Sequence, residues 1–597
     1  MRGRSRRFAI LRSYAARVVA VGCALALVAS ICLVRMVSLQ LMGGATADAA
    51  VQGRTLKVTT TAKRGRILDS SGIVLAQSVE RYNIIANPMY AAEFEPVECT
   101  EKTESYCHQI DGKPVGATGA AAVARLLATV LDMSAARIGA KIVDPNSQYA
   151  VIAKDVTPEV KRRIDELNLG GIVYGELTNE RVYSGGTLLG PILGAVDADG
   201  AGVAGLEQTL DDTLTGTDGY MVYQQGNGGE QIPGTLTDQK DAVDGSDVTL
   251  TIDESVDWYV KKALTDGKEK YKATWGIGVV YDLQTGGLLA IEDTDQYEAG
   301  SDDVKLNASR AVSEVFEPGS IGKVFTMAGM VQEGLHSLSD KFTVPSTIEQ
   351  DGQTYKDAST HGAEHWTLAG ILKNSSNVGM IMAAENFSDE KRYEYLTKFG
   401  VGQATGLDLS GESAGILTSS SDWDLRTRNT VLFGQSYAMN ALQITRAIAT
   451  IANKGVLPQM RIIASTTDAD GHTTENKVSG GTRVIDESVA AQMLNAMESV
   501  AEGYYSIAKV DGYRVAAKSG TAEVAGSNGS LTSIISDWSA ILPADNPRFV
   551  VTVAFKDAEG LGGLTAGPVA CQIGEFLMQK YNVSPSPERT DAIPVDW

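Results

Sequence analysis

A serine and a lysine three positions apart are residues whose types and spacing could do chemistry. Ser320 follows the dipeptide Pro318-Gly319, and Lys323 precedes a run of apolar residues. Because Pro-Gly favours a turn and serine is common where helices begin, we expect a helix to start at or just after Ser320. The i,i+3 spacing then places the hydroxyl beside the amine on one helix face. A buried lysine loses its charge easily, so this pair could act as nucleophile and base without a histidine.

The serine–lysine spacing alone is a weak signal, because it recurs in the chain. Ser388 with Lys391 and Ser506 with Lys509 have the same spacing, and such pairs usually lie on the solvated surface of a helix. What distinguishes Ser320 is the presence of two further polar clusters later in the sequence.

These two clusters carry hydroxyl, amide and ammonium groups. Residues 375–377 read Ser-Ser-Asn where a helix is expected to start, and residues 518–521 read Lys-Ser-Gly-Thr at the end of an expected β-strand. Taken singly, the first is most often a helix cap and the second a strand-end turn. Together with S-x-x-K, and in this order, they match the S-D-N and K-T-G motifs of penicillin-binding proteins and class A β-lactamases, with two mild changes to serine.

On these three motifs the chain resembles a class B penicillin-binding protein, a monofunctional peptidoglycan D,D-transpeptidase of the septal, cell-division type. Shorter matches to that family lie at residues 64–69, 205–207, 433–436, 451–455 and 562–569. Two departures are Asn440-Ala441, where the family has Thr-Pro, and the loop holding Cys99 and Cys107, which resembles an insertion. Neither departure touches the three motifs.

The resemblance implies a catalytic role for four residues. Ser320 would attack the penultimate D-Ala carbonyl of a stem peptide after neutral Lys323 takes its proton. Ser375 would relay a proton to the leaving D-Ala, and Asn377 would position the substrate and Lys323. An amine from a neighbouring stem peptide would then resolve the acyl-enzyme as a cross-link, whereas an acyl-enzyme formed with a β-lactam would persist.

The resemblance also implies substrate-binding residues. Lys518, with the hydroxyls of Ser519 and Thr521, would hold the terminal carboxylate of the substrate, and Gly520 completes this motif. The backbone N–H groups of Ser320 and Thr521 would form the oxyanion hole. Neither a cofactor nor a metal is expected.

Two alternative functions remain open. A serine β-lactamase would need a carboxylate to activate the deacylating water, and the chain has no E-x-x-L-N between Ser375 and Lys518. An acylable β-lactam sensor or a division scaffold without turnover would use the same fold for binding. An intact set of motifs argues against lost catalysis, and sensors usually carry several membrane spans where this sequence shows one.

Residues 361–365 match a zinc-protease pattern by letters alone. They read His-Gly-Ala-Glu-His, which fits H-x-x-E-H. That motif needs a regular helix to direct both imidazoles, whereas Thr360 and Gly362 indicate a loop. We therefore interpret this stretch as a polar turn and expect no zinc.

Charge and hydropathy predict a membrane anchor. The formal net charge is −21, yet the first seventeen residues carry six arginines and no acid. We expect residues 1–17 to form a cytoplasmic tail and residues 18–42 a transmembrane helix, with the remaining chain outside the cell membrane. A cleaved signal peptide is the alternative, because residues 45–47 offer a small-residue cleavage site.

The five cysteines predict no redox site. Cys23 and Cys32 fall in the apolar N-terminal run, and Cys571 lies in an apolar C-terminal segment where we expect it to be buried. Cys99 and Cys107 flank a short polar loop, where a local disulfide is compatible with an extracytoplasmic compartment.

The remaining chain is long enough for two domains. We expect a mostly β pedestal, or dimerisation, domain over residues 43–245 and a penicillin-binding transpeptidase domain over residues 246–597. The latter reads as α+β, because a helix is followed by antiparallel strands, then by a block of helices, and then by more strands and a helix. The strands are expected at 276–282, 287–292, 513–518, 537–542 and 548–555. Further expectations are a hairpin within residues 64–76, helices at 118–131, 158–167 and 256–264, and a closing helix near 569–580.

The expected partners follow from these features. Peptidoglycan stem peptides and β-lactams would bind the site, and the anchor would sit in the cell membrane. No glycosyltransferase motif is evident in the pedestal, so a membrane glycan polymerase and other division proteins are expected partners. The acidic balance argues against nucleic acid.

Overall fold

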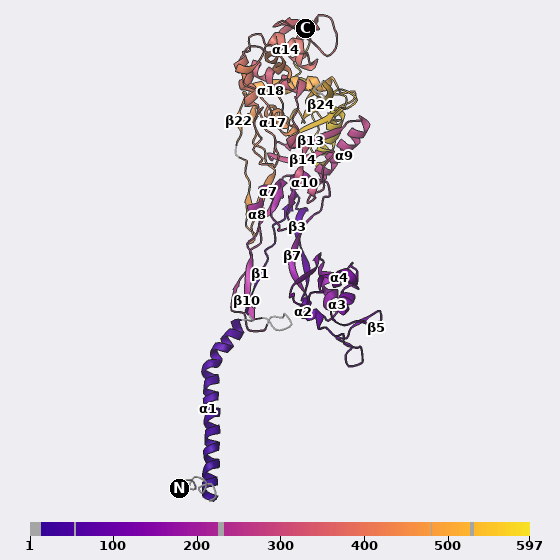
Figure 1. The fold of residues 1–597 in the computed structure, drawn as a ribbon. Helices are drawn as coiled ribbons and strands as arrows, with labels where there is room; N and C mark the ends of the chain where they lie inside the picture. The colour runs from indigo at the N-terminus through magenta and orange to yellow at the C-terminus, as the bar shows by residue number, and fades with distance from the viewer. Residues whose placement is uncertain (1–13, 53–54, 225–231, 479, 526–530) are drawn as a thin grey trace. The chain divides into compact units, whose positions relative to one another are not determined.

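The computed structural model describes residues 14–52, 55–224, 232–478, 480–525 and 531–597 (Figure 1). Most of the expected basic tail therefore lies outside the described residues. The chain divides into two compact units. Unit 1 comprises Met1–Thr61, Glu80–Thr178 and Asp218–Ala242, and unit 2 comprises Ala62–Val79, Asn179–Thr217 and Val243–Trp597.

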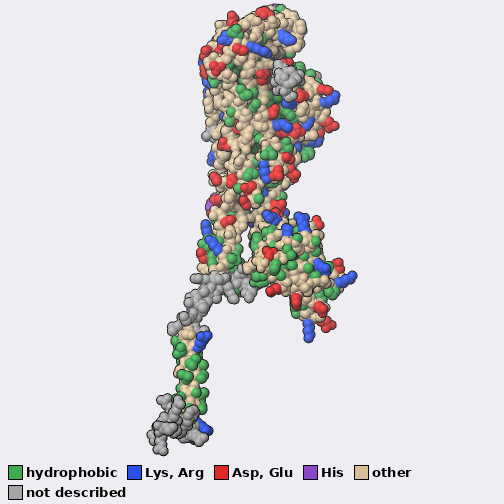
Figure 2. All heavy atoms as spheres, in the orientation of Figure 1, with side chains coloured by type: hydrophobic (Ala, Val, Ile, Leu, Met, Phe, Trp, Pro, Cys, Tyr) green, Lys and Arg blue, Asp and Glu red, His purple; other side chains and the backbone are tan. Residues whose placement is uncertain are grey.

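The apolar N-terminal run is a helix, as expected. Helix α1 (Tyr14–Gln52) contains the segment Tyr14–Ser38, whose most apolar window has a mean hydropathy of 2.4. Hydrophobic side chains cover this segment, which is not buried against the rest of the protein (Figure 2). Its 25 residues rise about 37 Å as a helix, which is enough to cross a hydrocarbon layer of about 30 Å.

Unit 1 combines short strands and helices. Strand β10 (Gly219–Gln224) pairs antiparallel with β1 (Thr55–Thr60) and with β11 (Asp238–Lys240). Two helices fall where the sequence predicts them, α3 (Gly119–Leu127) and α5 (Pro158–Asp165).

Local chemistry accounts for features of unit 1. Thr157 caps α5, because its side chain accepts the Val160 N–H and a proline follows it at the first helical position. Cys99 and Cys107 are joined by a disulfide in the polar loop that joins α2 (Pro88–Ala92) to α3.

The first segment of unit 2 contains the turn of a hairpin and Arg64, which belongs to a buried ion cluster. Strand β2 (Ile67–Leu68) pairs antiparallel with β3 (Val74–Ala86), which confirms the expected hairpin. Glu207, on the short helix α7 (Gly205–Thr209), is fully buried and bonds Arg64 at 2.6 Å and Arg181 at 2.7 Å. Two guanidinium groups compensate one buried carboxylate, so this cluster joins the residue stretches 62–79 and 179–217 within the unit.

A five-stranded antiparallel sheet forms the centre of unit 2. In spatial order its strands are β14 (Gly287–Asp293), β13 (Trp275–Asp282), β25 (Phe549–Lys556), β24 (Leu531–Leu542) and β23 (Ala516–Ala525). The expected hairpin of β13 and β14 is confirmed. All residues of β13 and β14 are buried, because helices cover both faces.

One face of the sheet packs on α9 (Glu254–Lys270) and α19 (Ala566–Lys580). Cys571 of α19 is buried there, as predicted. The other face packs on α17 (Ala441–Ala452), while α18 (Glu487–Glu502) lies against β23. The protein is therefore α+β, with helices on an antiparallel sheet, as predicted from its sequence.

Candidate active site

Ser320 lies where a turn becomes a helix. A 3₁₀ turn (Gly319–Ile321) leads into α12 (Gly322–Gln332), which confirms the expected helix start. Gly319 has φ +49°, and a Cβ there would lie 2.7 Å from the Thr521 carbonyl oxygen and 2.9 Å from the Thr521 nitrogen. Glycine is therefore required for the turn to approach β23 so closely.

Lys323 is fully buried and contacts Ser320. Its Nζ lies 2.9 Å from Ser320 Oγ and 2.5 Å from the Ser375 carbonyl oxygen. Burial lowers the pKa of Lys323 well below its ordinary value, the charge of Lys518 lowers it further, and Asp357 opposes the shift. A neutral amine at this distance can accept the hydroxyl proton of Ser320.

Ser375 connects the two lysines of the site. It lies between α13 (Leu368–Lys373) and α14 (Asn377–Ala383), with a left-handed φ of +54°. Lys323 Nζ lies 3.3 Å from Ser375 Oγ, and Lys518 Nζ donates to the same oxygen at 3.0 Å. A left-handed serine costs about 1–2 kcal/mol, and this conformation places its hydroxyl between the two amines.

The expected helix cap at Ser-Ser-Asn is confirmed, and Ser376 provides it. Its side chain accepts the Gly379 N–H at 2.8 Å. Asn377 begins the helix, and its side-chain amide donates to the Lys356 carbonyl oxygen at 3.2 Å, not to Lys323.

Asp357 is a neighbour of the site that sequence reasoning missed. Its carboxylate accepts Ser376 Oγ–H and the Asn377 N–H, each at 2.6 Å, and the Val378 N–H at 3.0 Å. It thus fixes the segment that carries Ser375. A carboxylate about twenty positions before a motif gives no local signal in the sequence.

The other partner of Asp357 belongs to the H-x-x-E-H stretch. His361 Nε2 lies 3.0 Å from Asp357 Oδ2. Burial lowers the pKa of His361, but hydrogen bonds to Asp357 and to the Gly362 carbonyl outweigh it and raise the pKa. His361 lies in a loop and His365 on strand β18 (Glu364–Thr367), so no helix carries both imidazoles.

The Lys-Ser-Gly-Thr motif lies inside β23, and the expectation of a strand-end turn was wrong. The ladder continues through Gly520, opposite Asp537, and through Thr521, opposite Ser536. The glycine marks a close approach of a neighbouring group rather than a strand end. Lys518 is fully buried, and burial lowers its pKa to about 7, with partial opposition from Asp537.

The remaining motif side chains have their own partners. Ser519 is largely buried, and its Oγ lies 3.5 Å from the Tyr504 hydroxyl. Thr521 Oγ1 donates to the Gly520 carbonyl oxygen at 2.8 Å and accepts the Gly562 N–H at 3.3 Å. The structure therefore joins Ser320, Lys323, Ser375 and Lys518 in one chain of polar contacts.

The two decoy serine–lysine pairs lie in solvated surroundings. Ser388 caps helix α15 (Asp389–Lys398), and Lys391 Nζ pairs with Glu333 at 3.1 Å. Lys509 is more than half exposed. Neither lysine is desolvated as Lys323 is.

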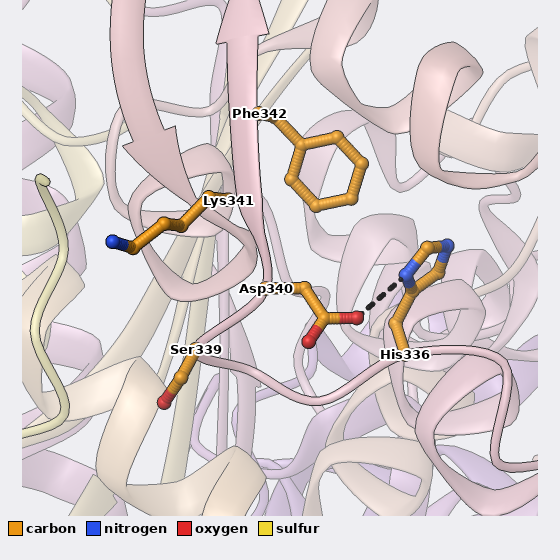
Figure 3. A pocket seen from close by; sticks show the side chains of 5 residues that line it. All are labelled: His336, Ser339, Asp340, Lys341 and Phe342. Atoms are coloured by element: carbon orange, nitrogen blue, oxygen red, sulfur yellow. Dashed lines mark hydrogen bonds and ion pairs between the residues drawn. The ribbon is translucent and has the colours of Figure 1, made fainter.

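A hollow elsewhere in unit 2 is lined by His336, Ser339, Asp340, Lys341 and Phe342 (Figure 3). His336 and Asp340 face each other at 2.9 Å, while the Ser339 and Lys341 side chains point away from them. The second ring nitrogen of His336 lies 3.0 Å from the Ala383 carbonyl oxygen. Both ring nitrogens are thus engaged in structural contacts, and no motif residue lines this hollow.

Comparison with known proteins identifies the family. Residues 276–575 match the penicillin-binding protein transpeptidase domain, and residues 59–250 match the penicillin-binding protein dimerisation domain. The chain is 30% identical to the peptidoglycan D,D-transpeptidase FtsI of Escherichia coli K12, over 89% of this chain and 86% of that protein.

Solved structures agree. A peptidoglycan synthetase from Bifidobacterium adolescentis is 65% identical, with a TM-score of 0.74, over 91% of this chain and all of that one. Penicillin-binding protein 3 of Mycobacterium tuberculosis in complex with aztreonam is 27% identical, with a TM-score of 0.67, over 89% of this chain and 98% of that one.

The chain belongs to the class B penicillin-binding proteins. Within that class it is a serine-type peptidoglycan D,D-transpeptidase.

Proposed function

We propose that Ser320 is the nucleophile and that Lys323 is its base. The observation that carries this proposal is the chain of contacts from Ser320 through Lys323 and Ser375 to Lys518. Neutral Lys323 takes the Ser320 proton, and Oγ attacks the penultimate D-Ala carbonyl. The proton returns through Ser375 to the leaving D-Ala amine, and an amine of a second stem peptide then resolves the ester.

Lys518 binds the terminal carboxylate of the donor peptide. An anion beside an amine whose pKa is about 7 raises that pKa, so the cation forms as the substrate docks. Ser519 and Thr521 add hydroxyl donors, and Gly520 leaves room for the strand to lie against its neighbours. The Ser320 and Thr521 N–H groups form the oxyanion hole, because the Gly319 turn packs directly on Thr521.

Asn377 positions the substrate: it lies two residues after Ser375 in the chain, and its side-chain amide donates to the Lys356 carbonyl oxygen and not to Lys323.

The cellular setting belongs to the same proposal. Residues 1–17 form the cytoplasmic tail, 18–42 the anchor, 43–245 the pedestal and 246–597 the extracytoplasmic transpeptidase domain. The similarity to FtsI supports a role in septal wall synthesis. A membrane glycan polymerase and other division proteins are its partners, with peptidoglycan strands as substrate.

Intact-mass spectrometry tests the nucleophile. The full-length protein in detergent micelles is incubated with a labelled penicillin, beside Ser320→Ala and the control Ser388→Ala, whose serine only caps α15. One stable adduct per chain is expected for the wild type and the control, and none for Ser320→Ala. An adduct retained in Ser320→Ala contradicts the assignment.

The same samples separate the alternative functions. Hydrolysed penicillin without an adduct indicates a β-lactamase. A stable adduct without cross-linking of stem peptides, in the presence of a glycan polymerase and lipid-linked precursor, indicates a sensor or scaffold.

A further inference from the structure

A buried carboxylate lies behind the Lys-Ser-Gly motif and has no role in the mechanism above. Asp537 on β24 stands opposite Gly520 and is 1% exposed. Within the described part of the chain, neither of its carboxylate oxygens has a hydrogen-bond partner. An ionised carboxylate in such a place would lose its hydration without compensation, which is strongly unfavourable.

The missing side chain of Gly520 creates the space that Asp537 fills. A Cβ on Gly520 would lie 2.0 Å from Asp537 Oδ1 and 2.4 Å from the Pro318 carbonyl oxygen. Both oxygens therefore lie within 2.4 Å of the same point, which is the position that this Cβ would occupy. The Pro318 carbonyl accepts the Ile321 N–H at 3.2 Å, and a carbonyl oxygen has a second lone pair to offer.

Two acceptor oxygens attract each other only when one of them carries a proton. Burial raises the pKa of Asp537 well above its ordinary value, against the opposing charge of Lys518. Lys518 Nζ donates to Ser375 Oγ at 3.0 Å and to the Ser519 carbonyl oxygen at 2.9 Å. Both of these acceptors lie in the site, and neither is a carboxylate oxygen of Asp537. The Asp537 carboxyl group therefore keeps its own proton.

We propose that Asp537 is a protonated carboxylic acid that donates a hydrogen bond to the Pro318 carbonyl oxygen, and that it is a positioning residue for the oxyanion hole. Pro318 lies two residues before Ser320, and Gly520, which Asp537 faces, directly precedes Thr521. The bond therefore ties together the two segments whose N–H groups form the hole. This inference rests on the proposed role of those two N–H groups.

The consequence is geometric, because an oxyanion hole works only when both donors face the oxygen where charge develops. Without the bond, the Pro318–Gly319 turn can shift relative to β23. The noncovalent binding of a β-lactam depends on Lys518 and the hydroxyl groups, so the acylation step should suffer and the binding step should not.

Stopped-flow acylation by a fluorescent penicillin tests the proposal on the full-length protein in detergent micelles. It yields the acylation rate constant and the noncovalent dissociation constant separately for Asp537→Ala and Asp537→Asn. Asp537→Ala should lower the rate constant by about 10- to 100-fold, with an unchanged dissociation constant. Asp537→Asn should stay within a few fold of the wild type, because its amide is neutral and can donate to the same carbonyl.

Asp257→Asn is the matched control. Asp257 is another fully buried carboxyl group, and it accepts the Ile291 N–H at 3.0 Å beneath β14, away from the three motifs. Its neutralisation should leave both constants at the wild-type values. Ser320→Ala separates the two proposals, because acylation that survives in that variant would refute the proposed nucleophile and not the role of Asp537.

An Asp537→Asn variant as slow as Asp537→Ala would overturn the proposal, because it would mean that the negative charge acts, as a counter-ion of Lys518. Wild-type acylation in Asp537→Ala would overturn it as well. If the alanine variant does not fold, infrared difference spectra of wild type against Asp537→Asn still decide. Loss of a protonated carboxylic acid band at pH 7 is expected, and loss of an ionised carboxylate band would refute the protonated donor.

Discussion

Replacing Lys518 with methionine should stabilise unit 2 while it abolishes acylation. Lys518 is fully buried, and burial lowers its pKa to about 7. Methionine is of similar length and has no charge, so the substitution removes the titrating group without leaving a large cavity. The protein would thereby lose a functional group that lowers its free energy of unfolding.

The magnitude follows from proton linkage. The pKa of a lysine in an unfolded chain is about 10.4, whereas the pKa of Lys518 in the folded protein is about 7. Between these values the unfolded chain binds the extra proton, so the free energy of unfolding falls as pH falls. The buried amine then costs about 4 kcal/mol at pH 7 and less than about 1 kcal/mol at pH 10. The hydrogen bond to Ser375 Oγ, worth about 1 kcal/mol, is lost at both pH values.

Thermal melting followed by tryptophan fluorescence measures this effect. All six tryptophans lie in unit 2, so the signal reports that unit in the full-length protein. Lys518→Met should melt several degrees above the wild type at pH 7 and close to it at pH 10, and it should not react with penicillin. Lys509→Met replaces an exposed lysine of the same unit and should melt like the wild type at both pH values.

Two outcomes would refute this reasoning. A Lys518→Met protein that melts below the wild type at pH 7 would mean that its partners hold Lys518 as a stable cation. A gain of equal size at both pH values would mean that packing, and not titration, limits stability.

Three further substitutions have definite expected outcomes. Gly319→Ala should abolish penicillin acylation without unfolding the protein, because its Cβ would collide with the Thr521 backbone; normal labelling would refute the close packing. Asp357→Ala should reduce the acylation rate about 10- to 100-fold with partial recovery in Asp357→Asn, whereas a rate equal to the wild type would show that Ser376 needs no carboxylate. Glu207→Ala strands two buried guanidinium groups and should cost about 3–5 kcal/mol in melting experiments, with Glu475→Ala as an exposed control.

Features that depend on local signals could be predicted from the sequence. The Pro-Gly turn before Ser320 indicated the helix start there, and the Asp-Ser-Ser-Gly turn between β2 and β3 indicated their hairpin. Apolar runs of the correct period indicated β13, β14 and α19. In each case, residues within about one turn or one strand determine the structure.

Features that depend on distant contacts could not be predicted in this way. Asp357 reaches Ser376 from nineteen positions away, and the opposition of Asp537 to Gly520 depends on the β23–β24 register. Gly520 gave a misleading signal, since a glycine after a strand usually marks its end. Here the glycine allows a carboxylate and a carbonyl to approach the strand.

The two lysines explain how binding and chemistry are coupled in the proposed mechanism. The charge of Lys518 lowers the pKa of Lys323, and the substrate carboxylate raises the pKa of Lys518. A docked donor peptide therefore recruits a proton to Lys518, and that positive charge in turn favours the neutral form of Lys323. Because Ser375 Oγ contacts both amines, it is placed to carry a proton between them. Recognition of the terminal carboxylate thus prepares the base that activates Ser320.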